Sequence, residues 1–480
     1  MLYYLILIYF IAVAIPIIIS IIYDKREPVK SLSWILVVVF LPFIGSFLYF
    51  SLGQDLRKRK IFHRKHIEDF QYTDYIIYRQ MYEINSLIFD GGVDSIFHRD
   101  IGTLLLNNNR APLFRDEKVE VLSDGRSCFD SIIEALQEAR IFIHFEFYII
   151  RDDKIGNEIA DILCQKSREG VEVRIIYDGV GSWGLSKKYI NKLRDAGVEI
   201  YPFMPVILPK LTNHINYRNH RKIIVVDGKV GFTGGMNVAD KYIEGLSHIG
   251  IWRDLHLKIE GKSIATLQRI FMVDWSFVSG KKLNVSVKYF PPFKKIEGGI
   301  ATQIASSGPD SEWATIMQAF FAAITKAKEY IHIATPYFTP NPQILTALKV
   351  AALCGIDVKL IIPGNSDSKL VLWATRSFIT ELINSKVKVY FYRGGFIHSK
   401  LLLVDGEFCS VGSANMDIRS FDDNFEVTAF IYDKAKSEEL EQIFQEDLSN
   451  SRRVIKRWWL NRPLLHRFYE SMARLLSPLL

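Results

Sequence analysis

The sequence predicts an α/β fold made of two similar halves, with a transmembrane helical hairpin in front of them. One observation is an internal repeat, in which the segment 220–237 matches the segment 398–415 in residue types and spacing. Another is that short apolar runs, typical of strands buried on both faces, alternate with helical segments in both halves. The third is a pair of long stretches near the N-terminus that lack any charged residue.

Residues 1–56 form the predicted hairpin. The stretches 1–23 and 31–53 contain no charged residue, and each is long enough to cross a hydrocarbon core of about 30 Å as a helix. We therefore expect two transmembrane helices over about 2–23 and 31–53, joined by a short polar loop at 24–30. A cleaved signal peptide would explain the first stretch alone, but this stretch lacks a basic beginning and a second apolar stretch follows at once.

Basic residues beside the spans predict the side of the membrane on which the rest of the chain lies. Arg57-Lys58-Arg59-Lys60 follows the second span and, with Arg64 and Lys65, outweighs the three basic residues of the loop between the spans. Because positive charge stays on the cytoplasmic side, we expect the large C-terminal part to be cytoplasmic. An amphipathic connector at 57–111 leads to this part.

The C-terminal segment 451–480 is basic and amphipathic. Between Arg452 and Arg474 it carries seven Lys and Arg with only Glu470 opposing them, interleaved with tryptophans and leucines. Such a helix is typical of one that lies flat in a membrane interface next to anionic head groups. The alternative is a terminal helix that docks on the protein core.

The internal repeat divides the remainder into an α/β domain at 112–290 and a second at 291–450, with a break near Pro291-Pro292. Strand-like segments recur in the same order in both halves, each part of a largely parallel or mixed sheet between helices. The matched pairs are 139–144 with 327–332, 170–176 with 355–361, 198–201 with 387–390, and 222–227 with 400–405. The four cysteines form no C-x-x-C pair, which suits reduced thiols in a cytosolic compartment, and no zinc-ligand spacing occurs.

Each half carries one histidine, one lysine, one aspartate and one asparagine at identical spacing. The first half has His220, Lys222, Asp227, Gly235 and Asn237, and the second has His398, Lys400, Asp405, Ser413 and Asn415. One copy would be a weak signal, but two matched copies suggest a single active site that both halves assemble.

These residue types suit a phosphate ester. The lysines would neutralise the non-bridging oxygens and the asparagine amides would add directional donors. One imidazole can attack phosphorus while the other protonates the leaving alkoxide, and a covalent phosphohistidine divides one hard displacement into two easier ones. We expect no metal and no cofactor, because the lysines supply the charge neutralisation.

Other residues of the motifs have structural interpretations. Asp227 and Asp405 each precede a glycine, so a turn-capping role competes with a catalytic one. Gly235 and Ser413 would permit close approach to the phosphate or to a facing strand. The histidines outside the motifs (His144, His332 and His214) are more easily explained as core or supporting residues.

These motifs resemble the H-x-K-x4-D motifs of the phospholipase D superfamily over about 112–450. The segments 216–222, 252–254 and 413–426, the two spans and the closing Arg-Leu-Leu-Ser-Pro-Leu-Leu look like bacterial cardiolipin synthases. The resemblance implies two phospholipase D-like repeats that form a pseudo-twofold sandwich of sheets and helices. It also implies a multi-pass protein of the bacterial inner membrane, with phosphatidylglycerol as both donor and acceptor and cardiolipin and glycerol as products.

The resemblance further implies a role for each site residue. His220 would be the nucleophile, and His398 would protonate the leaving glycerol and then deprotonate the acceptor. Lys222, Lys400, Asn237 and Asn415 would hold the phosphoryl oxygens, whereas Asp254 and Glu426 would orient the histidines. The near-symmetry of the sequence does not by itself distinguish the two histidines.

Three alternatives to this function remain. A membrane hydrolase, or a phosphatidyltransferase with another alcohol or phospholipid as acceptor, would use the same residues. A nuclease would have no use for membrane spans, and no basic-aromatic platform near the motifs suggests base stacking, so we expect no nucleic acid partner. A non-catalytic membrane scaffold would be expected to have lost a motif.

Overall fold

The computed structural model describes residues 9–23, 28–41, 43–52, 96–205, 217–284, 286–293, 295–475 and 477. The first residues of the first expected span, most of the connector 57–111 and His214 therefore lie outside the described residues.

The N-terminal residues form short helices. A π-helical turn η1 (Phe10–Ala14) leads into α2 (Ile15–Tyr23), and the second expected helix is divided into α3 (Pro28–Phe40) and α4 (Ile44–Leu52). At the break, Phe43 has a φ of 68°, and the sequence places a proline just before it, which removes a backbone donor and disfavours helix. Among the described residues, no helix combines the length and the apolar character needed to span a membrane.

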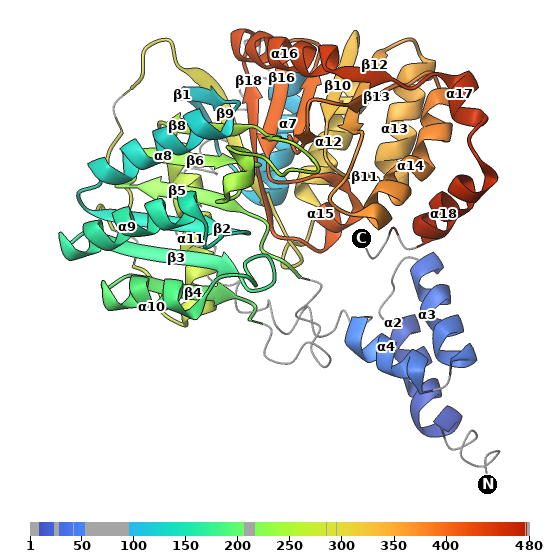
Figure 1. Cartoon of the computed structure of the whole chain (residues 1–480), viewed down its shortest axis with the longest axis horizontal. Coiled ribbons are helices and arrows are strands. Elements are labelled where there is room, and N and C mark those ends of the chain that lie inside the picture. Colours follow the sequence, from blue (N-terminus) through green and yellow to red (C-terminus); the bar gives the residue numbers. More distant parts are fainter. Residues whose placement is uncertain are drawn as a thin grey trace.

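The two halves share one continuous mixed sheet of 15 strands (Figure 1). Its order is β19-β13-β12-β10-β15-β16-β18-β9-β1-β8-β6-β5-β2-β3-β4, so the first half reads outward from β1 in the same order as the second half reads outward from β9. The strands of the first half are β1 (Leu113–Leu122), β2 (Phe142–Phe147), β3 (Glu172–Asp178), β4 (Glu199–Phe203), β5 (Lys222–Val226), β6 (Val230–Gly234) and β8 (His256–Glu260). Their counterparts are β9 (Ile300–Ser307), β10 (Tyr330–Ala334), β12 (Asp357–Pro363), β13 (Lys388–Tyr392), β15 (Leu401–Val404), β16 (Phe408–Gly412) and β18 (Glu426–Tyr432), with β19 (Ser451–Arg453) added at the edge.

An antiparallel pair at the centre joins the halves. Strand β1 pairs with β9, so that Leu113 lies opposite Gln303 and Phe114 opposite Thr302. In the first half, β2 pairs in parallel with β3 and antiparallel with β5, the strand of the first motif. In the second half, β10 pairs in the same way with β12 and β15. The sheet is therefore mixed, as the apolar runs predicted.

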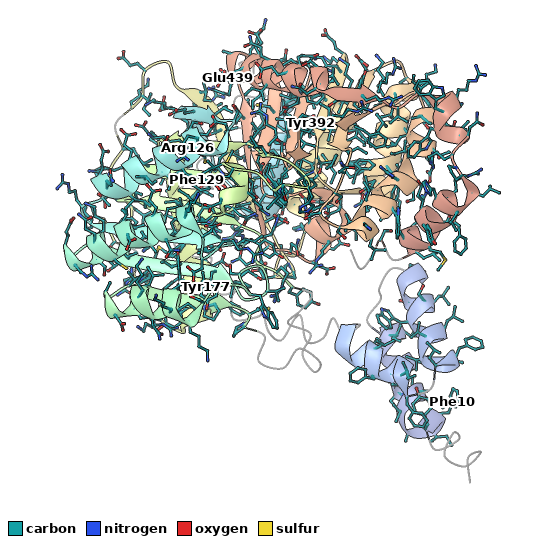
Figure 2. All side chains as sticks on the ribbon, in the orientation of Figure 1. Phe10, Arg126, Phe129, Tyr177, Tyr392 and Glu439 are labelled. Carbon is teal, nitrogen blue, oxygen red and sulfur yellow. The ribbon has the colours of Figure 1, made fainter. Side chains whose placement is uncertain are left out.

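Helices cover the sheet in layers. The described helices of the body are α7 (Ile96–Asn109), α8 (Gly125–Glu138), α9 (Lys154–Arg168), α10 (Lys187–Asp195), α11 (Ile264–Ser279), α12 (Thr315–Lys326), α13 (Pro342–Leu353), α14 (Lys369–Asn384), α15 (Ile418–Asp422), α16 (Lys434–Ser449), α17 (Lys456–Leu460) and α18 (Leu464–Leu475). Helices α8, α9 and α10 pack on the outer face of the first half, where Phe129 of α8 and Tyr177 of β3 are buried (Figures 1 and 2). Helices α12, α13 and α14 cover the outer face of the second half in the same way.

A third core lies between the halves. Ile223 and Val225 of β5 belong to the same buried cluster as Leu401 and Leu403 of β15, together with residues of α11 and α16. The inner faces of the two half-sheets therefore pack together, which makes the arrangement a sandwich of sheets and helices. Helix α7 precedes the first half in sequence but packs in the core of the second, where Asn108 Nδ2 donates to Gln318 Oε1 at 2.8 Å.

The last helix, α18, docks on α14 along one face. Tyr469 stacks on Trp373 at 5.0 Å between ring centroids, and Arg474 forms an ion pair with Glu381 at 2.5 Å. The opposite face is open: Leu464 is 78 % exposed and Phe468 is 58 % exposed. The helix thus docks on the core, the alternative stated above, and still exposes an apolar face to the outside.

The motif aspartates hold neighbouring strands rather than the turns that follow them. The Asp227 carboxylate accepts the backbone N–H groups of the first residue of β2 and of the two residues before it, and Asp405 does the same for β10. These donors are Arg140, Ile141 and Phe142 at 2.8, 2.8 and 2.9 Å, and Lys328, Glu329 and Tyr330 at 2.7, 2.8 and 2.9 Å. Both aspartates have a φ of 53°, a region that aspartate tolerates better than most residues.

This arrangement predicts a loss of stability in Asp227→Asn. An amide keeps one acceptor oxygen but turns two N–H donors toward backbone N–H groups, so we expect the free energy of unfolding to fall by about 2 kcal/mol. Urea unfolding followed by tryptophan fluorescence measures the change. The matched control is Asp195→Asn at the exposed end of α10, for which we expect less than about 0.5 kcal/mol. Equal stability of the two variants would contradict the structural role.

Candidate active site

The two motif histidines line one cavity of about 360 Å³ between the halves. Residues of both halves and of α14 surround it. They are Tyr148, Ile149, Arg218, His220, Asn237, Lys241, Trp252, Tyr337, Thr339, Asp367, Val371, His398, Asn415, Asp417, Arg419 and Asn424. The structure thus brings together the two histidines and the two asparagines that the repeat predicts.

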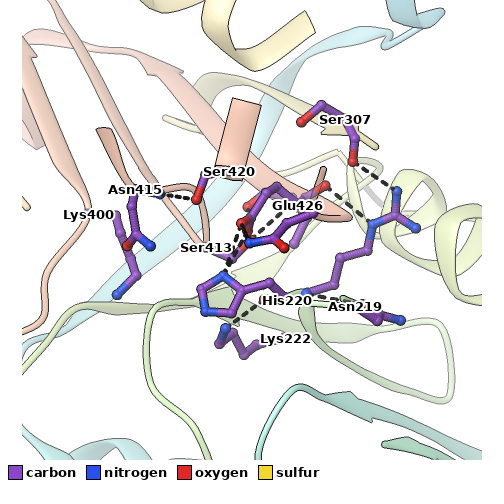
Figure 3. A network of polar contacts seen from close by, with 12 residues as sticks. Asn219, His220, Lys222, Ser307, Lys400, Ser413, Asn415, Ser420 and Glu426 are labelled. Atoms are coloured by element: carbon purple, nitrogen blue, oxygen red, sulfur yellow. Dashed lines mark hydrogen bonds and ion pairs between the residues drawn. The ribbon is translucent and has the colours of Figure 1, made fainter. Parts of the chain in front are cut away.

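Each histidine is bound by a carboxylate of the other half, and Figure 3 shows the pair of His220 and Glu426. His220 Nδ1 lies 3.0 and 3.1 Å from the two oxygens of Glu426, and His398 Nδ1 lies 2.5 Å from Asp254 Oδ2. Both carboxylates are fully buried. Because Nδ1 is engaged with a carboxylate, Nε2 is the ring nitrogen left for chemistry in each case, and that of His398 also lies 3.3 Å from Lys400 Nζ.

Short backbone pairings between the halves fix these two contacts. His220 N donates to Phe425 O at 2.9 Å and Phe425 N donates to Arg218 O at 2.9 Å, just before Glu426 begins β18. On the other side, His398 N donates to Arg253 O at 2.7 Å. There β14 (Phe396–Ile397) runs parallel to β7 (Trp252–Arg253). Each histidine therefore lies on a segment of its own half that pairs with backbone of the partner half.

The motif lysines lie beside the histidines, and both are buried. Lys222 Nζ donates to His220 O at 2.6 Å, and Lys400 Nζ donates to His398 O and lies 2.8 Å from His398 Nδ1. Burial lowers the pKa of Lys400 to about 8 and that of Lys222 well below its ordinary value. A bound anion would raise the pKa of both lysines and favour their charged forms, so the pair is suited to a phosphate group.

The two histidine–carboxylate pairs differ electrostatically. Burial lowers the pKa of His220 to about 4, against the opposing effect of Glu426. Burial also lowers the pKa of His398 well below its ordinary value, and the nearby lysines lower it further. The pKa of Glu426 is lowered, since its contact with His220 outweighs the effect of burial, whereas burial raises the pKa of Asp254 to about 6.

The asparagines face the cavity from matched positions. Asn237 Oδ1 accepts from Ile149 N at 3.1 Å and its Nδ2 donates to Tyr242 OH at 3.1 Å. Asn415 N donates to Ser420 Oγ at 3.2 Å, and its buried Oδ1 has no hydrogen-bond partner among the described residues. Asn415 is therefore the more open of the two amides toward a bound group.

Gly235 and Ser413 are matched to the carboxylates of their own halves. Ser413 Oγ donates to Glu426 Oε2. At Gly235 an added Cβ would lie 2.1 Å from Asp254 Oδ1, so only glycine leaves room for that carboxylate. Both residues act on the carboxylates behind the histidines and not on the cavity itself.

Several residues proposed from the sequence lie elsewhere. Asp227 and Asp405 are absent from the cavity lining and bind the backbone, so the catalytic role entertained for them has no geometric support. His144 stacks on Phe271 in the core with Nδ1 3.0 Å from Gln268 Oε1, and His332 stacks on Phe444. Among the described residues, no three His, Cys, Asp or Glu side chains are grouped so as to hold a metal ion.

The repeat alone did not single out other residues of the cavity. Tyr148 packs edge-on against His220 at 4.9 Å between ring centroids, and Tyr337 against His398 at 6.4 Å. Lys241 and Arg419 each follow their motif asparagine by four residues, a matched spacing that would have identified them. Tyr148 follows β2 directly and Tyr337 comes shortly after β10, the counterpart of β2 in the second half.

Comparisons with known proteins agree with this site. A family described as "Cardiolipin synthase, PLD-like domain" matches residues 132–275 and 320–448, and one described as "Phospholipase_D-nuclease N-terminal" matches residues 12–54. The chain is 44 % identical over 462 residues to a cardiolipin synthase of Alkalihalophilus pseudofirmus, covering 96 % of this chain and 91 % of the relative. It is 39 % identical over 462 residues to the major cardiolipin synthase of Bacillus subtilis, covering 95 % of each.

One solved structure has a related fold. A phosphatidylserine synthase of Haemophilus influenzae superposes with a TM-score of 0.58 at 14 % identity, over 79 % of this chain and all of that one. The fold, the matched motifs and the identity to relatives over nearly the full length lead to one assignment. The chain belongs to the cardiolipin synthase family of the phospholipase D superfamily.

Proposed function

We propose that this protein is a cardiolipin synthase that transfers a phosphatidyl group from one phosphatidylglycerol to another, with release of glycerol. The family gives the activity, and one geometric observation supports the route. Two imidazoles, each bound at Nδ1 by a carboxylate, line one cavity, and a buried lysine lies beside each of them. That constellation fits two successive in-line displacements at phosphorus.

In the first step, Nε2 of His220 attacks the donor phosphorus and the bond from phosphorus to the glycerol oxygen breaks. His398 gives its proton to that oxygen, and glycerol leaves. The new N–P bond is a phosphohistidine, and Lys222, Lys400, Asn237 and Asn415 neutralise or bind the non-bridging oxygens.

In the second step, His398 removes a proton from the free hydroxyl of an acceptor phosphatidylglycerol. The resulting oxygen attacks phosphorus, the N–P bond breaks, and cardiolipin leaves with His220 restored. The same groups act in the opposite order when cardiolipin and glycerol react, so the transfer is reversible.

The electrostatic difference between the two pairs supports His220 as the nucleophile. An ionised Glu426 at Nδ1 increases the electron density of the His220 ring, and the lowered pKa of this histidine keeps it neutral for attack. Asp254, with its raised pKa, lies 2.5 Å from His398 and suits a proton shared between carboxylate and imidazole. A phosphodiester bound between the lysines would also raise the pKa of His398, because it cancels the positive charges that lower it.

A hydrolase, or a transferase with another acceptor, would use the same residues and is the alternative. The difference lies in which hydroxyl reaches the phosphohistidine. A cavity mouth at a bilayer surface supplies lipid hydroxyls at high local concentration and limits water.

We further propose that the N-terminal segment anchors the protein in the bacterial inner membrane as a hairpin, with the α/β halves in the cytoplasm. The support is the absence of charge in 1–23 and 31–53 and the basic run that follows. The basic segment 451–480 would bind anionic head groups through the open face of α18. Helix α14 supports this, because its Val371 lines the cavity while its Trp373 contacts α18.

The first test of this function uses vesicles of phosphatidylglycerol labelled in the free glycerol. We expect cardiolipin and labelled glycerol in equal amounts from the wild-type protein. His220→Ala and His398→Ala should each lower turnover by about a thousandfold or more, since each removes an obligatory proton or nucleophile step. Phosphatidic acid without cardiolipin would favour hydrolysis and contradict the proposal.

A trapping experiment distinguishes the two histidines. With phosphatidyl-p-nitrophenol as donor, the leaving group needs no proton, so His398→Ala should release nitrophenol in a single burst and retain a phosphorylated histidine. His220→Ala should give neither. A burst in His220→Ala would reverse the assignment.

The second prediction concerns pH. The value of kcat/KM should fall below about pH 4, where His220 becomes protonated and cannot attack, and above about pH 8, where Lys400 loses its charge. Glu426→Gln should shift the acid limb to lower pH, because Glu426 raises the pKa of His220. Lys400→Arg should move the alkaline limb upward, since arginine stays charged to about pH 12. An unmoved alkaline limb in Lys400→Arg would exclude this lysine as its source.

The third prediction places α18 at the membrane. A polarity-sensitive fluorophore on Leu465→Cys, in a Cys354→Ser background that removes the exposed cysteine, should shift its emission to the blue with phosphatidylglycerol vesicles. The control is Ile141→Cys, which is exposed just before β2 and so lies at the far end of that strand from Tyr148 of the cavity. Identical spectra at the two positions would contradict an interfacial α18.

A further inference from the structure

Lys241 is a cavity residue that the transfer scheme above does not use. It lies four residues after Asn237 and lines the same cavity as both histidines. Its Nζ sits 3.3 Å from the ring centroid of Trp252, and the Trp252 ring packs 5.0 Å from that of His398. The ammonium group is therefore on the His398 side of the site.

No carboxylate forms an ion pair with Lys241 in the described part of the chain. The nearest acidic group in the lining is Asp367, whose Oδ2 accepts a hydrogen bond from Tyr337 OH at 2.9 Å. Burial lowers the pKa of Lys241 to about 8, against the opposing effect of Asp367. Lys241 lies over the indole of Trp252, beside His398, and lines the cavity. Its ammonium group is therefore suited to bind an anionic group of a ligand.

The chemistry of the two half-reactions identifies this anion. His398 handles the alcohol in both steps, so the leaving glycerol and the acceptor hydroxyl occupy the same place in turn. Glycerol is uncharged, whereas the acceptor phosphatidylglycerol carries a phosphate one glycerol unit away from its reacting hydroxyl. Only the acceptor therefore presents an anion on the His398 side.

We propose that Lys241 binds the phosphate of the acceptor lipid and thereby selects a phosphate-bearing alcohol over water and glycerol. This inference rests on the transfer function proposed above and adds a second phosphate site to it. In the reverse direction the same lysine holds the phosphate of the departing phosphatidylglycerol when cardiolipin is the donor. The site for the reacting phosphate, between Lys222 and Lys400, is separate.

The pseudo-symmetry of the fold supports a binding role for Lys241. Arg419 follows Asn415 by the same four residues and also lines the cavity. Each half thus places one cation next to its asparagine. Lys241 is stacked on an aromatic ring that contacts His398, which is why we assign the acceptor to this side.

Two reactions of the same full-length protein test the proposal. Cardiolipin synthesis requires an acceptor with a phosphate, whereas exchange of labelled free glycerol into phosphatidylglycerol uses an acceptor without one. In Lys241→Met we expect cardiolipin synthesis to fall by about tenfold to a hundredfold, as for loss of one charged hydrogen-bonding group. Glycerol exchange should change by less than about threefold, and KM for the acceptor should rise more than kcat falls.

Two further variants complete the experiment. Lys241→Arg keeps the charge and should recover most of the synthesis, and Lys229→Met, an exposed lysine in the turn between β5 and β6, should alter neither reaction. Equal loss of both reactions in Lys241→Met, or loss of neither, would overturn the acceptor-phosphate site. Either result leaves the transfer function standing if the wild-type protein makes cardiolipin. A wild-type protein that makes none would instead refute the function itself.

Discussion

The contact between each histidine and a carboxylate of the opposite half is the constraint on which the site depends. Neither half contains a complete catalytic pair, since His220 needs Glu426 and His398 needs Asp254. Both carboxylates are buried, so their free energy of desolvation must be offset by these bonds. The common core between the half-sheets and the central pairing of β1 with β9 hold the halves in the position that makes the bonds possible.

Much of this arrangement could be predicted from the sequence, because duplication leaves a readable signal. The strands, the mixed sheet and the meeting of both histidines in one cavity follow from two copies of one pattern. The exchange of carboxylates between halves could not be derived, since it depends on contacts distant in sequence such as that of His220 with Phe425. The expected second span was divided in the structure near Phe43, where local backbone geometry overrides uniform apolar composition.

A second limit of the sequence concerns what each residue does, both inside and outside the repeated motifs. Asp227 and Asp405 belong to the repeated pattern, yet their carboxylates bind the first backbone groups of β2 and β10. Repetition therefore marks what both halves need, whether for folding or for chemistry. Tyr148 and Tyr337 reach the cavity from loops, where no periodic pattern indicates a side chain. Helix α14 also lies outside the motifs, yet its Val371 lines the cavity and its Trp373 contacts α18.

The pairing of Gly235 with Asp254, and of Ser413 with Glu426, has a consequence for how the duplicated halves differ. The shorter carboxylate requires a residue without a side chain, and the longer one gains a hydroxyl donor. Each combination lies within one half. Each half therefore supplies a carboxylate, together with the small residue matched to it, to the histidine of the other half. If the two combinations were identical, the two histidines would be equivalent, and neither would be preferred as the proton donor. Divergence at these two positions breaks that equivalence while leaving the backbone symmetry intact.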